Sequence, residues 1–448
     1  MLKEAWKVAI ETLSLIEMQK LSEQMAFAKT IEKIQAKNPN SIRLAYSLII
    51  ETIRRKNQID KFINHVLNSE NINKLSFDLW SFLRLYIYQT RITKNWSKIY
   101  LREAEKIADL GRFIFGWKFF RQIEYILGFL LTQELSVIFE GADDLEREAL
   151  QSFHPKWFVK YILDLLGKKQ GLNFLQANND QLPTYLRLNT IKGSESEILN
   201  SLHYEGVELK KIKSLKCIYE VLYSKHALTK INSFKKRLFY IQDKASSFAA
   251  EIADPKPGNI VLDVCSAPGT KTSYLAQLMK NQGIIYSIDY SKRRTKIWKN
   301  EMRQMGVKIA FPIIADVCIS LPLDVSADII VLDPPCTSTG VFSKQPSAKW
   351  RITMQSIKKM ADIQWQILSK CACKVKSGGT IIYSTCSVTI EENEDIIGKF
   401  LKKYSDFYLA NIEPKIGLPG LKNLDKCQRF YPNIHRSNGF FVAKLIRQ

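Results

Sequence analysis

Short apolar runs alternate with longer amphipathic stretches throughout the second half of the chain. The runs lie at residues 260–264, 284–288, 309–314, 329–332 and 380–383. Strands that are buried on both faces have this composition, and the stretches between most of them fit helices. The rhythm predicts an α/β fold with a doubly wound, mostly parallel sheet over residues 241–448. Because ligands of such sheets bind beyond the carboxyl ends of the strands, the residues that follow each run are the first candidates for a site.

The first third of the chain has a different periodicity. Over residues 1–145, apolar residues recur at spacings of three and four with few prolines or glycines, which predicts a helical bundle. A helix start is expected near Pro155, and residues 183–190 alternate like a strand, so residues 146–240 are predicted to hold a linker helix and a small α+β module. The basic side chains of the bundle are expected on solvated faces, with some in reach of phosphates; they include Arg54, Arg55, Lys56, Arg102 and Arg112.

Charge narrows the class of partner. The 448 residues carry 66 Lys and Arg against 44 Asp and Glu, a net charge of +22 with a pI near 9.5. Such a balance favours a polyanionic partner such as nucleic acid over an anionic membrane surface, and also over a basic surface that has no partner. The lysines of the α+β module fit a phosphate-facing surface and a solvated face equally well.

The sequence also indicates a compartment. Residues 123–139 are interrupted by Glu124, Gln133 and Glu134, so they do not read as a membrane span, and the first residues do not read as a signal peptide. The eight cysteines are scattered, which predicts a reduced, cytoplasmic protein. The only close pair, Cys371 and Cys373, has the wrong spacing for zinc, so no metal is expected. We further expect a monomer.

The residues after the first three runs suggest a cofactor. The loop after the first run has small residues but a single glycine, which is a poor fit to a pyrophosphate cofactor. Asp289 ends the second run, where an acid commonly accepts hydrogen bonds from ribose, and Asp316 follows the third, where it could meet an adenine amino group. Together they predict an adenosyl ligand without a pyrophosphate, which S-adenosylmethionine satisfies. The loop residues expected to hold it are Cys265, Ser266, Ala267, Pro268, Gly269, Thr270 and Lys271.

The last two runs deliver an acid and two thiols. The fourth is followed by Asp333-Pro-Pro-Cys336, whose prolines stiffen the turn, and the fifth by Ser384-Thr-Cys386. Asp333 could bind the amidine-like edge of a base. Methylation of an aromatic carbon that is not nucleophilic requires a temporary covalent adduct, which a thiolate can form. Cys336 and Cys386 are therefore both candidate nucleophiles.

A set of ordered motifs carries a family resemblance. The motifs lie at residues 242–246, 261–272, 333–340, 383–387, 391–393 and 439–444. They resemble those of the Nop/Sun (Fmu, RsmB-like) RNA cytosine-5 methyltransferases and extend the likeness over roughly residues 150–448. The resemblance implies a class I methyltransferase with a Rossmann-like sheet.

The resemblance also implies roles for the site residues. Cys386 would attack C6 of a cytosine while the methyl group passes from S-adenosylmethionine to C5, and Cys336 would assist breakdown of the adduct. The loop 265–271, Asp289, Asp316 and Asp333 would hold the cofactor, with Asp333 and Lys271 also beside the base. Ser266 and Thr270 replace the usual Ala and Gly, both with small side chains.

The substrate is predicted from the N-terminal region. Residues 47–60 and 79–89 resemble helices of the NusB-type RNA-binding bundle. A NusB-like bundle joined to this catalytic domain resembles family members that act on small-subunit (16S-type) rRNA, so rRNA is the expected substrate and tRNA the second candidate. Two alternatives stay open: a DNA cytosine-5 methyltransferase that uses Cys336 as nucleophile, and a non-catalytic RNA-binding ribosome assembly factor.

Overall fold

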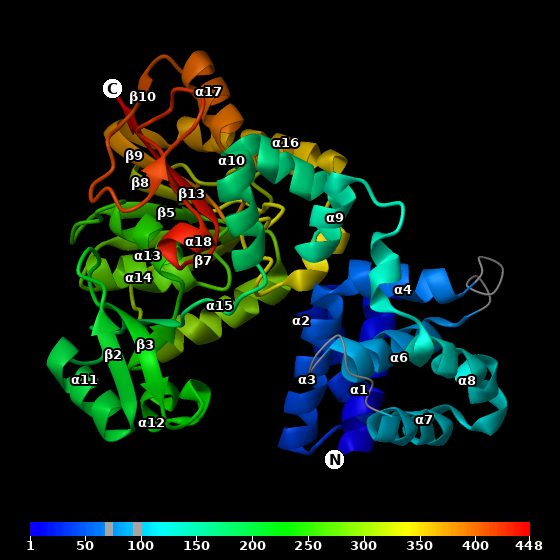
Figure 1. Cartoon of the computed structure of the whole chain (residues 1–448). Helices are drawn as coiled ribbons and strands as arrows, with labels where there is room; N and C mark the ends of the chain where they lie inside the picture. Colours follow the sequence, from blue (N-terminus) through cyan, green and yellow to red (C-terminus); the bar gives the residue numbers. More distant parts are fainter. Residues whose placement is uncertain (68–74, 93–100) are drawn as a thin grey trace. The chain divides into compact units, whose positions relative to one another are not determined.

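The computed structural model describes residues 1–67, 75–92 and 101–448. The chain forms two compact units (Figure 1). The helical unit comprises Met1–Asp180 and the inserted segment Phe342–Arg351. The other unit comprises Gln181–Val341 and Ile352–Gln448, and we call it the catalytic unit because it carries the residues that the sequence predicts to be catalytic. The inserted segment is therefore flanked on both sides by chain that belongs to the catalytic unit.

The helical unit is built from helices throughout its described residues, as its periodicity predicts; residues 68–74 and 93–100 of the predicted bundle lie outside that range. The helices are α1 (Leu2–Gln19), α2 (Glu23–Ile34), α3 (Pro39–Arg54), α4 (Lys56–Val66), α6 (Phe77–Ile87), α7 (Leu101–Phe115), α8 (Trp117–Thr132), α9 (Asp144–Gln151) and α10 (Lys156–Ala177). Helix α10 starts directly after Pro155. The apolar stripe of α3 is buried because it faces the core of the bundle. Phe82 is at the centre of this core, with its ring edge-on to Phe120 at 5.2 Å between centroids.

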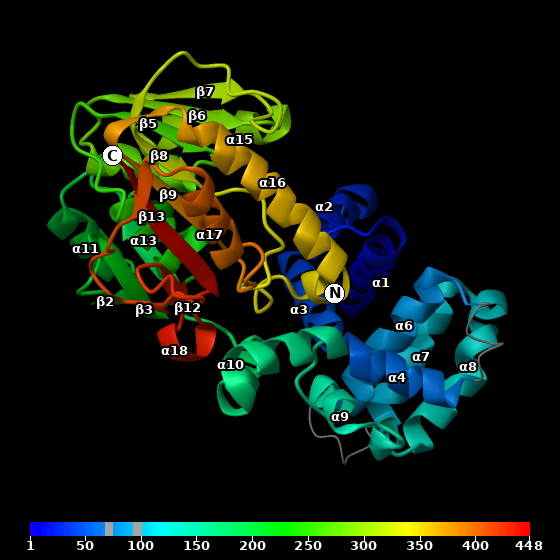
Figure 2. The same cartoon turned by 90° about the horizontal axis from the view of Figure 1, so that it is seen from above.

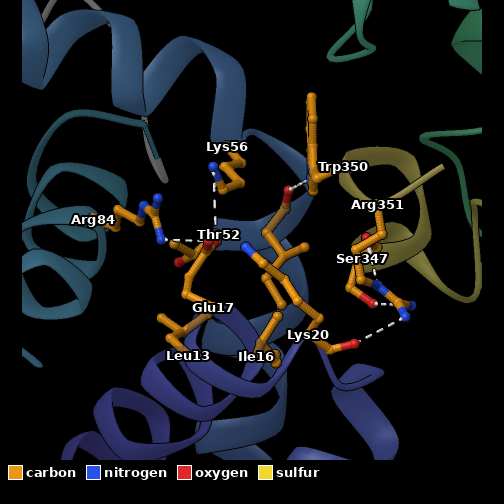
Figure 3. A pocket seen from close by; sticks show the side chains of 11 residues that line it. Leu13, Ile16, Glu17, Lys20, Thr52, Lys56, Arg84, Ser347, Trp350 and Arg351 are labelled. Atoms are coloured by element: carbon orange, nitrogen blue, oxygen red, sulfur yellow. Dashed lines mark hydrogen bonds and ion pairs between the residues drawn. The ribbon is translucent and has the colours of Figure 1, made fainter. Parts of the chain in front are cut away.

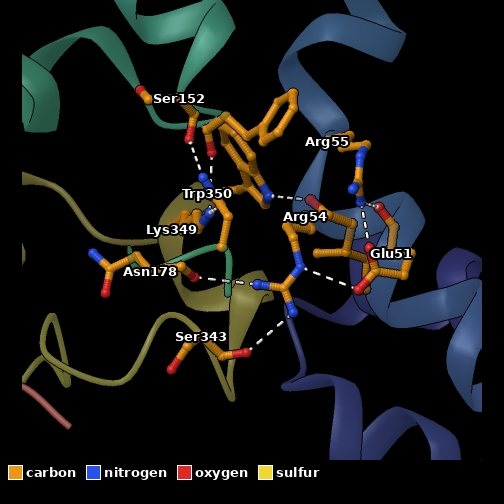
Figure 4. A network of polar contacts seen from close by, with 11 residues as sticks. Glu51, Arg54, Arg55, Ser152, Asn178, Ser343, Lys349 and Trp350 are labelled. Carbon is orange, nitrogen blue, oxygen red and sulfur yellow. Dashed lines mark hydrogen bonds and ion pairs between the residues drawn. The ribbon is translucent and has the colours of Figure 1, made fainter. Parts of the chain in front are cut away.

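One polar cluster holds the inserted segment within the helical unit (Figure 4). Lys349 is fully buried and donates hydrogen bonds to the Phe153 carbonyl at 3.1 Å and to Asn179 Oδ1 at 2.9 Å. Arg54 donates to the carbonyls of Asn178 and Ser343, each at 3.2 Å, and forms an ion pair with Glu51. We call these residues the cationic cluster. Burial, followed by the charges of Arg54 and Arg55, holds the pKa of Lys349 well below its usual range.

The cationic cluster corrects one expectation from the sequence. Arg54 was expected on a solvated face or at a phosphate, but only 6 % of it is exposed. Its guanidinium is occupied by carbonyls of the chain, because the inserted segment covers the C-terminal end of α3 with Trp350 donating from Nε1 to the Ile53 carbonyl at 2.8 Å.

A cavity next to this cluster also lies wholly in the helical unit (Figure 3). Its charged lining consists of four cations and one carboxylate, namely Lys20, Lys56, Arg84, Arg351 and Glu17. The cations are largely engaged within the unit, since Arg84 pairs with Glu17 and with Asp60, and Lys56 also pairs with Asp60. The charged side chains around this cavity therefore form an internal ion-pair network rather than an open anion-binding site.

The catalytic unit begins with a small antiparallel sheet of order β2-β3-β1-β4. Its elements are β1 (Tyr185–Leu188), α11 (Glu195–Tyr204), β2 (Val207–Lys211), β3 (Ile218–Ser224), α12 (Asn232–Lys235) and β4 (Phe239–Ile241). Strand β1 coincides with the alternating stretch in the sequence. A capping box between Ser194 and Glu197 fixes the start of α11.

The large sheet has the order β11-β12-β13-β9-β8-β5-β6-β7, with β10 paired to β13. Its parallel strands are β5 (Ile260–Val264), β6 (Ile284–Asp289), β7 (Ala310–Ile314), β8 (Ala327–Leu332) and β9 (Val375–Thr385). All five apolar runs are thus strands, which confirms the predicted doubly wound fold. The antiparallel extension consists of β10 (Phe407–Leu409), β11 (Leu418–Pro419), β12 (Gln428–Phe430) and β13 (Phe440–Arg447).

Helices cover both faces of the large sheet and give a three-layer unit (Figure 2). One face is packed by α13 (Lys244–Glu251) and α14 (Thr270–Leu278), and the other by α16 (Met354–Ala372) and α17 (Glu394–Lys403). Helix α15 (Lys292–Met305) lies against β6 and β7, and α18 (Pro432–His435) is a single turn. Among the described residues, no helix is both long and apolar enough to cross a membrane.

Candidate active site

The central parallel strands end at one edge of the large sheet. Strand β8 lies between β5 and β9, so the loops that follow these three strands are neighbours. They carry Cys265, Asp333 with Cys336, and Cys386. The candidates from separate motifs therefore meet at the carboxyl edge, where α/β sheets bind their ligands.

The two candidate thiols face each other directly. Cys336 Sγ lies 3.1 Å from Cys386 Sγ. The Ser338 hydroxyl is close to both sulfurs, 3.3 Å from Cys386 and 3.9 Å from Cys336. Ser338 has a φ of 59°, a left-handed conformation that is uncommon for a residue other than glycine, and it aims the hydroxyl at this pair.

The surroundings of the two thiols differ in their effect on ionisation. The hydrogen bond from Cys336, helped by that from Ser338, lowers the pKa of Cys386 despite its burial. The same bond and burial raise the pKa of Cys336 well above its usual range. These contacts therefore favour the thiolate at Cys386 over the thiolate at Cys336. This difference favours Cys386 as the nucleophile.

An ion pair lies at the same edge. Lys271, almost fully buried at the start of α14, pairs with the carboxylate of Asp333, whose side chain is 36 % exposed. The Lys271 ammonium also lies 5.8 Å from the centre of the Phe440 ring. An acid and an amine held together beside the thiols can contact the polar edge of a bound base.

The loop 265–271 is tightly constrained by its neighbours. Cys265 has a φ of 63°, and the next two amides donate to the Ile288 carbonyl at 3.0 Å and to Asp289 Oδ2 at 3.2 Å. Gly269 has a φ of 108°, and a Cβ there would lie 2.5 Å from Met302 Cε. The positive φ favours glycine at this position, and the Trp298 ring, whose Cδ1 would lie 2.9 Å from the same Cβ, adds a steric reason. Ser266 and Thr270, where the sequence departs from the family motif, both lie in this loop, and the Ser266 carbonyl accepts from the Gly269 amide at 2.8 Å.

A cavity opens beside this loop, and its walls fit an adenosyl group. Three residues expected to bind the cofactor line it: Cys265, Asp289 and Asp316. Asp289 is buried, accepts from the Ser291 amide at 2.9 Å and pairs with Arg294 at 3.3 Å, whereas Asp316 is exposed. Ser266 to Lys271 form the adjoining loop, and Asp333 is in the ion pair with Lys271.

Sequence reasoning did not identify the apolar walls of this cavity. They are formed by Ile288, Tyr290, Ala315, Val317, Pro335, Met360, Ile363 and Ile367. Tyr290 and Val317 directly follow the two predicted acids, Asp289 and Asp316, so their position just after a strand is a sequence feature that could have identified them as cavity residues. Ile363 and Ile367 lie on α16, where a pair of isoleucines four residues apart reads as ordinary core packing. Apolar walls with two carboxylates suit a purine and a ribose.

Sheet order, cofactor loop and paired thiols together define a Rossmann-like methyltransferase with a cysteine-based site. Comparisons with known proteins identify the family. The family described as 16S rRNA methyltransferase RsmB/F matches residues 250–446, and the RsmF/B-like ferredoxin-like domain matches residues 154–218. The chain belongs to the Nop/Sun (RsmB/F) family of RNA cytosine-5 methyltransferases.

Individual relatives agree with this assignment. The probable ribosomal RNA small subunit methyltransferase B of Bacillus subtilis is 27 % identical over 98 % of this chain and 99 % of its own length. The tRNA (cytosine(72)-C(5))-methyltransferase of Pyrococcus horikoshii is 35 % identical, over 49 % of this chain and 55 % of its own. The crystal structure of PH0851 superposes with a TM-score of 0.81 at 28 % identity and covers 100 % of this chain and 99 % of that chain.

Proposed function

We propose that this chain is an S-adenosylmethionine-dependent RNA cytosine-5 methyltransferase that acts on small-subunit rRNA, with Cys386 as its nucleophile. The observation that carries the proposal is the pair of thiols 3.1 Å apart, of which Cys386 ionises more readily. A cytosine C5 is a weak nucleophile, but addition of a thiolate to C6 breaks the C5=C6 double bond and leaves its electron pair in an enamine that is nucleophilic at C5.

The residues then have separate tasks. The Cys386 thiolate adds to C6, which places electron density on C5, while Asp333 and Lys271 contact the polar edge of the base. S-adenosylmethionine supplies the methyl group that C5 takes up. Removal of the C5 proton and cleavage of the Cys386–C6 bond restore the aromatic ring and free the enzyme. Cys336 assists this last stage as a neighbouring thiol: it donates its proton to the departing Cys386 sulfur and takes up the proton that leaves C5.

The cofactor is assigned from the chemistry of its cavity. Asp289 and Asp316 offer carboxylates to hydroxyl and amino groups, and the apolar walls suit an adenine ring. The 265–271 loop, with Gly269 and small side chains, lets a ligand approach the backbone. No group of three or more metal-ligating side chains occurs among the described residues, and the proposed reaction uses none.

Small-subunit rRNA is supported by the full-length likeness to the Bacillus relative, whereas the tRNA enzyme matches about half of the chain. The net charge of +22 suits a phosphate backbone. The target cytosine must leave its stack to reach a thiol at the sheet edge, which favours loops or incompletely assembled RNA. We propose that the enzyme works as a monomer in the cytoplasm, where both thiols stay reduced.

The nucleophile is tested by replacing each cysteine separately. Cys386→Ala should abolish both methyl transfer and covalent trapping on RNA that contains 5-fluorocytosine. Cys336→Ala should still trap the RNA and should accumulate adduct, because release is slowed. Trapping by Cys386→Ala but not by Cys336→Ala would show that the assignment is reversed, as in the DNA cytosine-5 enzymes. Failure of the purified wild type to bind S-adenosylmethionine in calorimetry would favour a non-catalytic assembly factor.

The substrate is tested in cells. Bisulfite sequencing of total RNA from a deletion strain should show the loss of one or more 5-methylcytosines from small-subunit rRNA. Loss from tRNA alone would move the assignment to the second substrate class.

A further inference from the structure

A buried glutamate joins the two loops that carry the thiols. Glu392 lies in the turn before α17, is fully buried, and accepts five hydrogen bonds. Its donors come from both sides of the site, so one carboxylate spans the gap between the loop after β8 and the loop after β9. We call Glu392 and the four side chains that donate to it the anionic cluster: Thr337, Gln364, Ser387 and Thr389.

The bonds on the β8 side hold the residues around Cys336. The Thr337 amide donates to Glu392 Oε1 at 2.8 Å, and the Thr337 hydroxyl donates to Oε2. Gln364 donates from Nε2 both to Glu392 Oε1 at 2.9 Å and to the Pro335 carbonyl at 3.0 Å. The residues immediately before and after Cys336 are therefore both tied to Glu392, one directly and one through Gln364.

The bonds on the β9 side hold the residue next to Cys386. The hydroxyls of Ser387 and Thr389 donate to Glu392 Oε2 at 2.6 and 2.9 Å. Tyr383, near the end of β9, donates to the Glu392 carbonyl at 2.6 Å, so the backbone of Glu392 is anchored as well. A shift of either loop would break at least two of these bonds.

The distance between the two thiols depends on how Glu392 aligns the loop after β8 with the loop after β9. Thr337 and Ser387 directly follow Cys336 and Cys386 in the chain, and the same β8 loop continues into Ser338, whose hydroxyl contacts both sulfurs. We propose that Glu392 is a positioning residue that holds the two loops in register, so that Cys336 and Ser338 both face Cys386 Sγ. The inference rests on the proposed function for its catalytic consequence, but its geometric part concerns the thiols alone.

Reach and charge of Glu392 act on Cys386 in opposite directions. The length of the Glu392 side chain lets it hold both loops, so that Cys336 and Ser338 contact Cys386 Sγ as hydrogen-bond donors, which favours the thiolate. Its negative charge, close to both thiols, disfavours the thiolate and contributes to raising the pKa of each. A side chain that only filled space would produce neither effect, so the two can be separated by substitution.

Two variants separate reach from charge. Glu392→Asp keeps the charge but is one methylene shorter and cannot bridge both loops. Glu392→Gln keeps the length, and the hydroxyls of Thr337, Ser387 and Thr389 can turn to accept from its amide. The readout is the pH dependence of iodoacetamide alkylation at Cys386, followed by peptide mass spectrometry, with no RNA or cofactor present.

We expect opposite shifts. In Glu392→Asp the midpoint for Cys386 alkylation moves to higher pH because the donors are lost, and kcat for methyl transfer falls about 100-fold with the KM for S-adenosylmethionine unchanged. In Glu392→Gln the midpoint moves to lower pH because the repelling charge is gone. Shifts in the same direction, or no shift in Glu392→Asp, would overturn the proposal.

Controls keep the result interpretable. Asp395→Asn removes an exposed carboxylate three residues away, which pairs with Lys422 on the surface, and should leave the alkylation profile unchanged. Should Glu392→Asp fail to fold, Thr337→Val removes one hydroxyl donor at nearly constant volume and must move the midpoint upward; an unchanged midpoint would count against the proposal. Alkylation of Cys386 needs neither RNA nor S-adenosylmethionine. If the wild-type protein transfers no methyl group but the alkylation midpoints shift as expected, the proposed function is wrong and the positioning role of Glu392 is still supported.

Discussion

The anionic and cationic clusters each use one buried charge to tie together distant segments, but they satisfy that charge very differently. Glu392 accepts five hydrogen bonds from four side chains and one backbone amide in the catalytic unit. Lys349 donates to two oxygens in the helical unit and is repelled by Arg54. The anion is fully ligated, whereas the cation is only partly so.

The difference shows what each cluster can do. Burial of a charged group is costly unless its surroundings replace the lost water with hydrogen bonds. Glu392 has that replacement and can fix two loops against each other beside the reacting thiols. Lys349 does not, and its lowered pKa means that it serves mainly as a long hydrogen-bond donor that closes the inserted segment onto the helices. Removal of the charged group should therefore lower the free energy of unfolding strongly in the anionic cluster and only slightly in the cationic cluster.

The largest expected effect comes from Glu392→Met, which has similar volume but no acceptor. It leaves buried donors without partners, and we expect the catalytic unit to lose about 3 kcal/mol or more of unfolding free energy. Hydrogen exchange measured by mass spectrometry on peptides from β8 and β9 would report this loss separately from the helical unit. Asp395→Asn is the control and should cost less than about 1 kcal/mol. If hydrogen-exchange protection of these peptides in Glu392→Met equals that of the wild type, the anionic cluster does not depend on its carboxylate, and the proposed difference between the two clusters is wrong.

The sequence was informative about the catalytic unit for a physical reason. Strands of a parallel sheet are buried on both faces and must be apolar, so all five runs could be recognised, and the residues after them fall at one edge. Cys336 and Cys386 could be expected to meet for this reason alone. Their 3.1 Å separation could not, because it depends on Glu392, whose partners lie on three separate segments.

The helical unit shows where such reasoning stops. Segment 342–351 follows the Cys336 loop in the chain, and nothing in its composition indicates that it packs with helices. That placement depends on bonds such as Lys349 to Phe153, which span 196 residues. The prediction of a solvated or phosphate-facing Arg54 is wrong for the same reason, because a basic residue on a helix is normally solvated unless a distant segment covers it. The short antiparallel strands β10, β11 and β12 have too few residues to show a period.

The pH dependence of stability should differ between the helical unit and the catalytic unit. In the folded chain the pKa of Lys349 is lowered, so over the range between that value and its unfolded value of 10.5 the unfolded chain binds one more proton. Stability of the helical unit should therefore rise with pH in that window, by at most about 1.4 kcal/mol per pH unit, and gain nothing from this group above it. Hydrogen exchange corrected for its intrinsic pH dependence, on peptides from α3 and α10, measures the slope. A slope that Lys349→Met leaves intact would assign the effect to another group.

The smallest expected effect is that of Lys349→Met at neutral pH. The substitution removes two hydrogen bonds and leaves the Phe153 carbonyl and Asn179 Oδ1 without that donor, which destabilises the helical unit. It also removes the cost of burying an amine beside Arg54, which stabilises it. Because these terms oppose each other, we expect a net change within about 1 kcal/mol, against the loss of about 3 kcal/mol or more for the same methionine at Glu392. Comparable losses in both variants would mean that Lys349 is held as a full charge, and the two clusters would then be equivalent.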